Sequence, residues 1–219
     1  MKNFFFALAL TLTAFSLAAQ DSRYTAAMTD AVAQLDTTKT MADYQAAANT
    51  FSRIASAEPK EWLPLYYASF SQLNAAFSLI KQDVAAALLT IDLAQANLDK
   101  ALALAPQESE LYVLQAYILI GRLMENPMAK GAEISPKVFA QLGKASAMNP
   151  DNPRAPFLQG TYTLNMPEFY GGGAAKAKPL FEKASGLFEK ETDRGLLPHW
   201  GKKGNAHYLE QVSTTEKGN

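Results

Sequence analysis

The chain has 219 residues, which is long enough for one large domain or two small ones with a substantial buried core. Its 20 basic and 21 acidic residues leave a formal net charge of −1, so composition gives no electrostatic case for binding nucleic acid or an acidic membrane surface. The absence of cysteine excludes disulfides, thiolate catalysis and cysteine-based metal clusters. Alanine, the best helix former, occurs 38 times, whereas the strand-favouring valine and isoleucine occur only 5 and 6 times. These numbers predict an all-α fold.

The N-terminal residues have the layout of a secretory signal peptide. Lys2 supplies a positive charge, residues 4–15 are apolar, and Leu17-Ala18-Ala19 offers a small-residue cleavage site. The apolar stretch is shorter than the roughly 20 residues that a membrane-spanning helix needs. We therefore predict a signal peptide over residues 1–19. The mature protein should be exported, to the periplasm or beyond the cell, without stable membrane insertion.

Apolar residues recur at helical spacing along the rest of the chain, and prolines mark where several helices should end. A loop is expected from Asn126 to Pro136, a second loop from Met166 to Gly173, and a polar tail over 214–219. The pattern predicts four helical hairpins (22–57, 61–105, 108–148 and 153–190) and a C-terminal capping helix, in one domain over 20–213. The expected helices are 22–36, 41–57, 61–81, 84–105, 108–125, 137–148, 153–165, 174–190 and 199–213.

A fixed spacing recurs in the second helix of each hairpin. The positions 12, 8 and 5 residues before Pro59, Pro106 and Pro150 hold apolar residues, and a fourth helix keeps the same spacing with Glu189 in place of the proline. A small residue lets two helices approach, a large one fills the space between them, and proline ends the helix. The four sets are Ala47/Phe51/Ile54, Ala94/Leu98/Ala101, Val138/Leu142/Ala145 and Ala177/Phe181/Ala184.

This spacing resembles the second helix of the tetratricopeptide repeat (TPR) family, in degenerate form, over residues 22–213. The prolines are 47 and 44 residues apart, against 34 in a regular repeat. The resemblance implies stacked antiparallel hairpins in a TPR-like solenoid; an unrelated antiparallel bundle is the alternative. The first helix of a TPR has a pattern with a tryptophan, a small residue and a tyrosine at fixed positions, and this pattern is weaker here. The small position holds Ser69, Ala116 and Gly160 in three hairpins. In the last helix the three positions hold Trp200, Gly204 and His207.

A second likeness is local and covers about 20 residues. The glycine run 171–173, followed by Phe181-Glu182-Lys183-Ala184, resembles the last-repeat motif of periplasmic helical-repeat proteins that accompany TRAP-type solute transporters. This likeness implies an alternative function, in which the protein is an accessory component of a transporter and holds a small ligand.

No catalytic constellation or cofactor motif is visible, so we expect no enzyme activity, no cofactor and no metal. His199 and His207 lie eight residues apart, whereas paired metal ligands on a helix lie three or four apart. We expect His207 to occupy a packing position and His199 to precede the last helix. The glycine run 171–173 lacks the Lys-Ser or Lys-Thr of a phosphate-binding loop, which predicts a turn into the following helix.

The leading functional expectation is a scaffold that binds a protein or peptide in a concave groove. In the TPR family the first helix of each hairpin lines that groove, and tyrosine, phenylalanine and arginine are typical of binding hot spots. A shift of register caused by the longer repeats would place some of these residues in the core instead. The resemblance assigns ten residues to the groove: Tyr66, Phe70, Glu110, Val113, Tyr117, Arg154, Phe157, Thr161, Asn205 and Tyr208.

Overall fold

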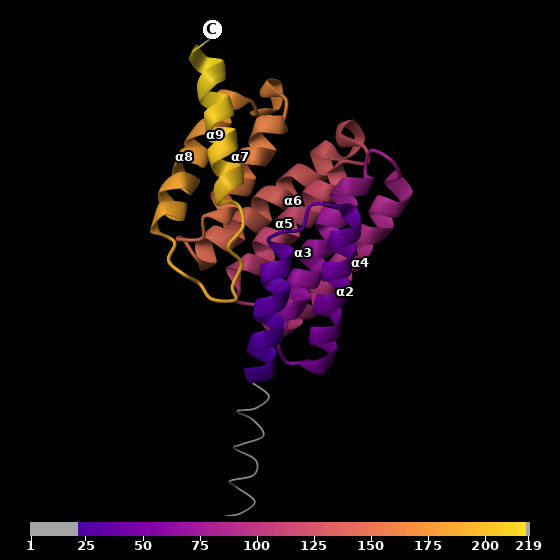
Figure 1. Ribbon diagram of the computed structural model, residues 1–219. Helices are drawn as coiled ribbons and strands as arrows, with labels where there is room; N and C mark the ends of the chain where they lie inside the picture. Colours follow the sequence, from indigo (N-terminus) through magenta and orange to yellow (C-terminus); the bar gives the residue numbers. More distant parts are fainter. Residues whose placement is uncertain (1–21, 218–219) are drawn as a thin grey trace, which may run out of the picture.

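The computed structural model describes residues 22–217, and within this range every regular element is helical (Figure 1). The predicted signal peptide over residues 1–19 lies outside the described residues. None of the described helices combines the length and apolar character that crossing a membrane requires. A helix over 22–35 is followed by α2 (Met41–Ala57), α3 (Trp62–Leu79), α4 (Val84–Leu104), α5 (Ser109–Leu123), α6 (Pro127–Met148), α7 (Arg154–Asn165), the 3-10 turn η1 (Glu168–Tyr170), α8 (Ala174–Lys190) and α9 (Lys202–Lys217).

The predicted loop from Asn126 to Pro136 is wrong, because these residues form the first half of α6. The Asn126 side chain caps the helix by accepting a hydrogen bond from the Ala129 amide at 3.0 Å. Pro127 occupies the first turn, where proline needs no backbone donor. Ile134, in the turn before Pro136, is buried in the core. The free energy gained by this packing outweighs the loss of the backbone hydrogen bond that Pro136 cannot donate.

The C-terminal helix also differs from its prediction. It begins at Lys202 rather than at residue 199, and it continues past Ser213 to Lys217, through most of the predicted polar tail. His207 is exposed on α9 and touches only the edge of Tyr208 among aromatic rings, so its predicted packing position is wrong. Gly204, another position of the predicted first-helix pattern, is closely packed. A Cβ at this position would lie 3.0 Å from Phe157.

The packing positions that the recurrent spacing predicted are confirmed as core. All of them except the half-buried Ile54 are buried, and Ala94, Leu98, Ala101, Phe181 and Ala184 are fully enclosed. Consecutive helices pack against one another, including α2 on α3, α3 on α4, α5 on α6, α7 on α8 and α8 on α9. The predicted hairpins 61–105, 108–148 and 153–190 are therefore present, and the glycine run 171–173 forms the predicted turn into α8.

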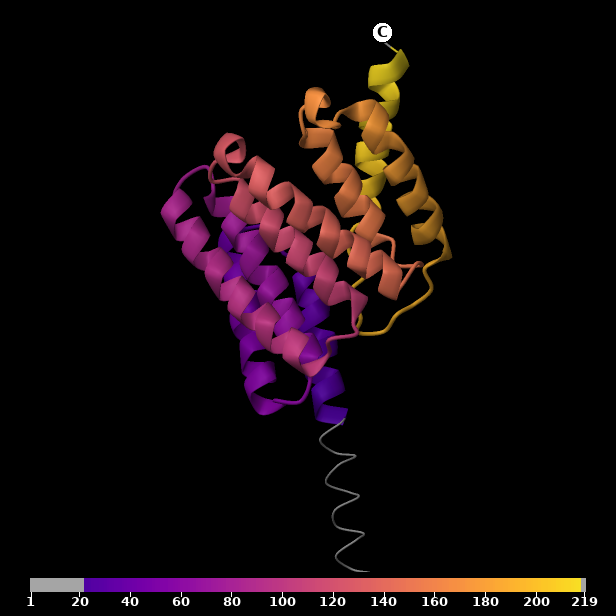
Figure 2. The ribbon, with the colours of Figure 1, turned by 180° about the vertical axis from the view of Figure 1, so that it is seen from behind.

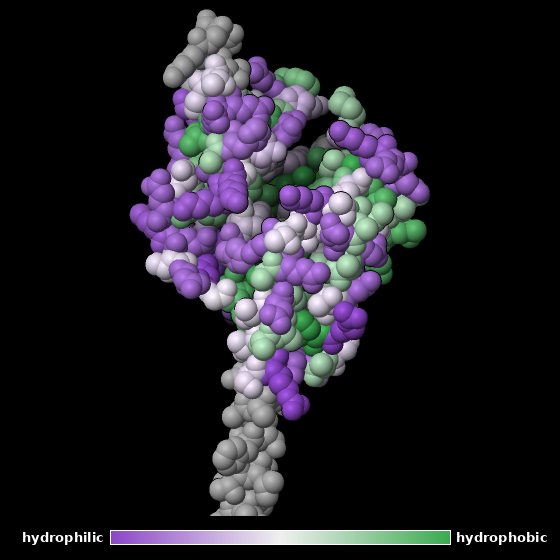
Figure 3. Space-filling model, in the orientation of Figure 1, coloured by the Kyte–Doolittle hydropathy of each residue, from purple (hydrophilic) through white to green (hydrophobic). Residues whose placement is uncertain are grey.

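The helices form two groups (Figures 1 and 2). One group contains the helix 22–35 and α2–α6, and the other contains α7–α9. The molecular surface is hollowed between the groups, and hydrophobic atoms line the bottom of the hollow (Figure 3). The segment 191–201, here called the linker, leads from α8 back toward α3 and α5 before α9 begins.

Candidate ligand-binding site

Five aromatic side chains from three separate elements form a continuous row. The rings follow the order Phe77, Tyr117, Trp200, Phe70 and Tyr66, with successive centroids 5.0, 5.8, 5.3 and 6.2 Å apart. Three of them come from α3, Tyr117 comes from α5 and Trp200 comes from the linker. Tyr66 is buried, whereas the other four are half-buried. The aromatic row therefore keeps partly exposed ring surface.

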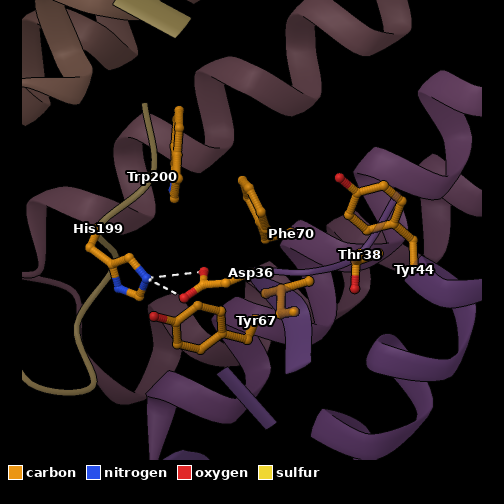
Figure 4. A pocket seen from close by; sticks show the side chains of 8 residues that line it. Asp36, Thr38, Tyr44, Tyr67, Phe70, His199 and Trp200 are labelled. Atoms are coloured by element: carbon orange, nitrogen blue, oxygen red, sulfur yellow. Dashed lines mark hydrogen bonds and ion pairs between the residues drawn. The ribbon is translucent and has the colours of Figure 1, made fainter. Parts of the chain in front are cut away.

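Trp200 and Phe70, from the middle of the aromatic row, also line a pocket of about 200 Å³ (Figure 4). The indole of Trp200 and the ring of Phe70 stand on one side of it, and Tyr44 from α2 faces them from the other side. His199 lies at the edge, where its Nε2 is 3.0 Å from both carboxylate oxygens of Asp36. The remaining lining residues are Leu35, Thr38 and Tyr67.

Tyrosine hydroxyls around the aromatic row are held in their neutral form. Burial raises the pKa of Tyr117, and the nearby phenols of Tyr208 and Tyr44 raise it further. Burial also raises the pKa of Tyr44. Both hydroxyls are neutral at pH 7, as an unshifted phenol also is, and each can donate one hydrogen bond.

The linker is fixed in place by a buried network of two arginines and two glutamates. Arg154 pairs with Glu191 through two contacts of 2.7 and 3.1 Å, and its Nη1 lies 3.3 Å from Glu110. Arg194 donates to Glu110 at 2.7 Å and to the carbonyl of Pro198 at 2.9 Å. Burial alone would lower the pKa of Arg194, but its hydrogen bond to Glu110 and the nearby carboxylates raise it. The network thus holds the linker against α5 and α7.

Two hydrogen bonds complete the attachment of the linker to α3. The Trp200 indole N–H donates to the phenol oxygen of Tyr66, and the Tyr67 hydroxyl donates to the carbonyl of Leu196, each at 2.8 Å. Trp200 also packs against the core clusters on both sides of the hollow. Its position is therefore determined by contacts with both helix groups.

The residues assigned to a groove from the sequence are dispersed over several environments. Tyr66, Phe70 and Tyr117 come together in the aromatic row. Glu110 and Arg154 are buried in the ion-pair network, at 1% and 0% exposure, and thus away from any open groove.

The other five assigned residues lie in or beside the cores of the α5–α9 region. Val113, Phe157 and Asn205 are buried, and Asn205 donates to the carbonyl of Phe181 at 3.0 Å. Thr161 and Tyr208 are half-buried. The ring of Tyr208 stacks on Phe181 at 5.6 Å. Six of the ten assigned side chains are buried, as expected if the longer repeats shift the register and move groove positions into the core. A partner-binding role for the ten residues stays a prediction.

Sequence reasoning did not assign Trp200, Tyr44, Asp36, His199 or Tyr67 to a site. Trp200 was matched to a packing position of the last helix, whereas it precedes α9. Helical periodicity cannot place residues of an extended linker, because the spacing carries information only inside a helix. In the described part of the chain, no three His, Cys, Asp or Glu side chains gather closely enough to hold a metal ion.

Comparison with solved structures finds a protein of similar fold. The structure of the HusA haemophore from Porphyromonas gingivalis matches this chain with a TM-score of 0.78 and 30% sequence identity, over 88% of this chain and 94% of that one. The chain belongs to the same family as HusA. No protein-family model matches the sequence, and no curated protein matches it significantly. The similarity to HusA extends over both helix groups, because it covers most of the length of each chain.

Proposed function

We propose that this protein is an exported, non-catalytic binding protein for haem or a closely related porphyrin, which it holds against the aromatic row. The observation that carries the proposal is the partly exposed row of Phe77, Tyr117, Trp200 and Phe70. These rings stack on one another, and their exposed parts offer a rigid apolar surface against which a planar aromatic ligand can pack with little loss of conformational entropy. Membership of the HusA haemophore family supports the same ligand class.

The pocket beside Trp200 supplies the polar part of such a site. A haem carries two propionate carboxylates at one edge of a hydrophobic plane. The hydroxyl of Tyr44 borders the pocket and is suited to donate a hydrogen bond to one of these carboxylates. The hydroxyl of Thr38 already donates to the carbonyl of Gln34, and the imidazole of His199 already faces Asp36. At about 200 Å³ the pocket is smaller than the roughly 300–1,000 Å³ of typical ligand sites. The macrocycle therefore lies partly outside it, in the hollow between the helix groups.

Three finer features complete the proposal. The hairpins follow a degenerate TPR-like register, as the buried positions around Phe51, Leu98, Leu142 and Phe181 suggest.

The signal peptide over residues 1–19 directs the chain to the periplasm or the exterior. Mass spectrometry of the mature protein should find an N-terminus near Ala19 or Gln20, and an intact Met1 would contradict export by this route. The alternative function, an accessory component of a solute transporter that holds a small ligand, is compatible with this binding role.

Titration with haemin tests the proposal directly. Binding should shift the Soret absorbance of haemin and quench the fluorescence of Trp200. Trp200→Ala and Tyr117→Ala should each weaken binding by tenfold or more, in the range of hot-spot residues at about 2 kcal/mol. Tyr24→Ala is the matched control, because Tyr24 is a half-buried aromatic residue on the helix 22–35, near Glu58 and Glu61.

Two results would contradict the proposal. The first is a wild-type protein that leaves the haemin spectrum unchanged. The second is binding that Tyr24→Ala weakens as much as Trp200→Ala does. If haemin does not bind, a peptide ligand in the same groove becomes the function to test, with Phe70, Tyr117, Thr161 and Tyr208 as the groove members that retain exposed surface.

A further inference from the structure

Helix α4 has a buried apolar face and, on the opposite side, three exposed leucines among charged residues. Its inner face is buried against α3 and α5. On its outer face Leu89, Leu93 and Leu104 are 67%, 54% and 43% exposed. Large apolar side chains that are exposed together, with charged residues around them, are typical of an interaction surface. The inner face consists of Ala87, Ile91, Ala94, Leu98 and Ala101.

The uncovered face points away from the candidate ligand site. Figures 1 and 2 both place α4 at the edge of the molecule, on the side opposite α8 and α9. Hydrophobic atoms appear on this edge of the space-filling surface (Figure 3). A partner on this face would leave the aromatic row accessible.

Two pairs of residues on the outer face are complementary about Ala96. When two copies of a helix pack antiparallel across a two-fold axis, a residue a given number of positions before the axis faces the residue the same number after it. With the axis at Ala96, Asp92 faces Lys100 of the other copy, and Leu89 faces Ala103. Opposite charges therefore meet twice, and the small Ala96 at the crossing point allows the helices to approach closely.

A groove beside the C-terminal half of α4 has room for the side chains of such a partner. Its volume is about 560 Å³, and it is bordered by Ala103 and Leu104 from α4 and by Ala55 and Pro59 at the end of α2. Lys100 is the only charged residue of its lining. In the antiparallel arrangement, Leu89 of the second copy points toward this groove, and Asp92 of that copy lies beside Lys100.

We propose that a second copy of this chain covers the outer face of α4, in a two-fold symmetric dimer centred on Ala96. The 21 residues of α4 span about 30 Å. One helix and its flanking groove form an interface at or below the lower end of the standard size, about 1,200 Å² in total. The dimer is therefore weak and depends on protein concentration.

Sedimentation velocity from low micromolar to millimolar concentration measures the dimer. The wild type should shift from monomer to dimer, whereas Leu89→Glu should remain monomeric. Met128→Glu is the matched control, because Met128 is 86% exposed and lies on α6, outside this face. A wild type that stays monomeric throughout would overturn the proposal. So would a dimer that Leu89→Glu leaves intact, since another surface would then form it.

Two further variants test the register of the contact. Asp92→Lys and Lys100→Asp should each weaken the dimer at least tenfold, and the double variant should recover most of the loss. Asp92 also pairs with Arg122 at an exposed site, which contributes little. Because the chain has no cysteine, Ala96→Cys provides a single thiol at the axis and should form a covalent dimer on mild oxidation. The exposed Ala206→Cys on α9 should not. Failure of both charge recovery and cross-linking would exclude this register.

Discussion

The indole N–H of Trp200 donates a hydrogen bond of 2.8 Å to the phenol oxygen of Tyr66, although 134 positions separate the two residues. This bond ties the linker to α3 and orients the indole so that it stacks on Phe70 and Tyr117. The geometry of the candidate ligand site therefore depends on Tyr66, the one member of the aromatic row that is fully buried.

Tyr66→Phe should separate this orienting role from simple packing. The change leaves the Trp200 N–H without its acceptor, which should cost about 1 kcal/mol in the free energy of unfolding. It should also weaken haemin binding several-fold, because the indole is no longer held in place. Tyr112→Phe is the control: the Tyr112 hydroxyl donates to the carbonyl of Pro106, also at 2.8 Å, so its loss should lower stability similarly without changing affinity. Equal affinity losses in both variants would contradict the role of Tyr66.

Arg154→Met should destabilise the protein more than any change at a surface ion pair. Arg154 is fully buried between Glu110 and Glu191, so its removal leaves carboxylates without their counter-charge. The expected loss is about 3–5 kcal/mol, measured by urea denaturation. Lys137→Met removes the exposed pair with Glu133 and should cost less than about 1 kcal/mol. Comparable losses in the two variants would argue against a structural role for the buried network.

Gly160→Ala should be destabilising, because a Cβ at this position of α7 would come within 2.7 Å of the Phe181 ring. The two helices would have to separate, at a cost of about 1–3 kcal/mol. Gly186→Ala in α8 has open space around the new methyl group and should instead stabilise the helix by about 0.5–1 kcal/mol. Thermal melts of both variants give the comparison, and a neutral Gly160→Ala would show that α7 and α8 are less tightly packed than the structure indicates.

The N-terminal cap of α2 should make stability depend on pH in the acid range. The side-chain hydrogen bond with Thr40, and then the Thr40 backbone amide, lower the pKa of Asp43 in the folded protein. A lowered folded-state pKa stabilises the fold above the unfolded-state value, about 3.9, and this contribution disappears as the pH falls through the folded-state value. Asp43→Asn should therefore be less stable than the wild type at neutral pH, and the gap in melting temperature should close in acid. A gap that is the same at both pH values would contradict this linkage.

The sequence predicted the helices and their packing faces well, because both depend on local spacing. The triple Ala94/Leu98/Ala101 is buried as its spacing indicated, and the spacing of Ala177/Phe181/Ala184 was equally informative. Asn126-Pro127 was misinterpreted as the start of a loop, although an asparagine before a proline is also a helix start. The same reasoning supports the expectation that Ala101→Leu or Ala145→Leu costs about 1–3 kcal/mol through overpacking.

The candidate site was less predictable, because it is made by contacts between residues that are distant in the sequence. Glu110 and Arg194 are 84 positions apart, and His199 and Asp36 are 163 apart. A groove position and a buried ion-pair position look alike in a helical pattern, since both place a polar residue on an inward face. Glu110 and Arg154 are buried ion-pair positions because the linker brings Arg194 and Glu191 against them.

The path of the linker also sets an order of assembly. Residues 191–201 follow eight of the nine α-helices along the described chain, so Trp200 is among the last residues to emerge during synthesis or to pass through an export channel. Until it arrives, the N-terminal helices can form their own core, but Phe70 and Tyr117 lack the ring that lies between them. The candidate ligand site is thus completed only once Trp200 has joined the N-terminal helices. Residues 22–190 alone would then lack a finished site for a ligand.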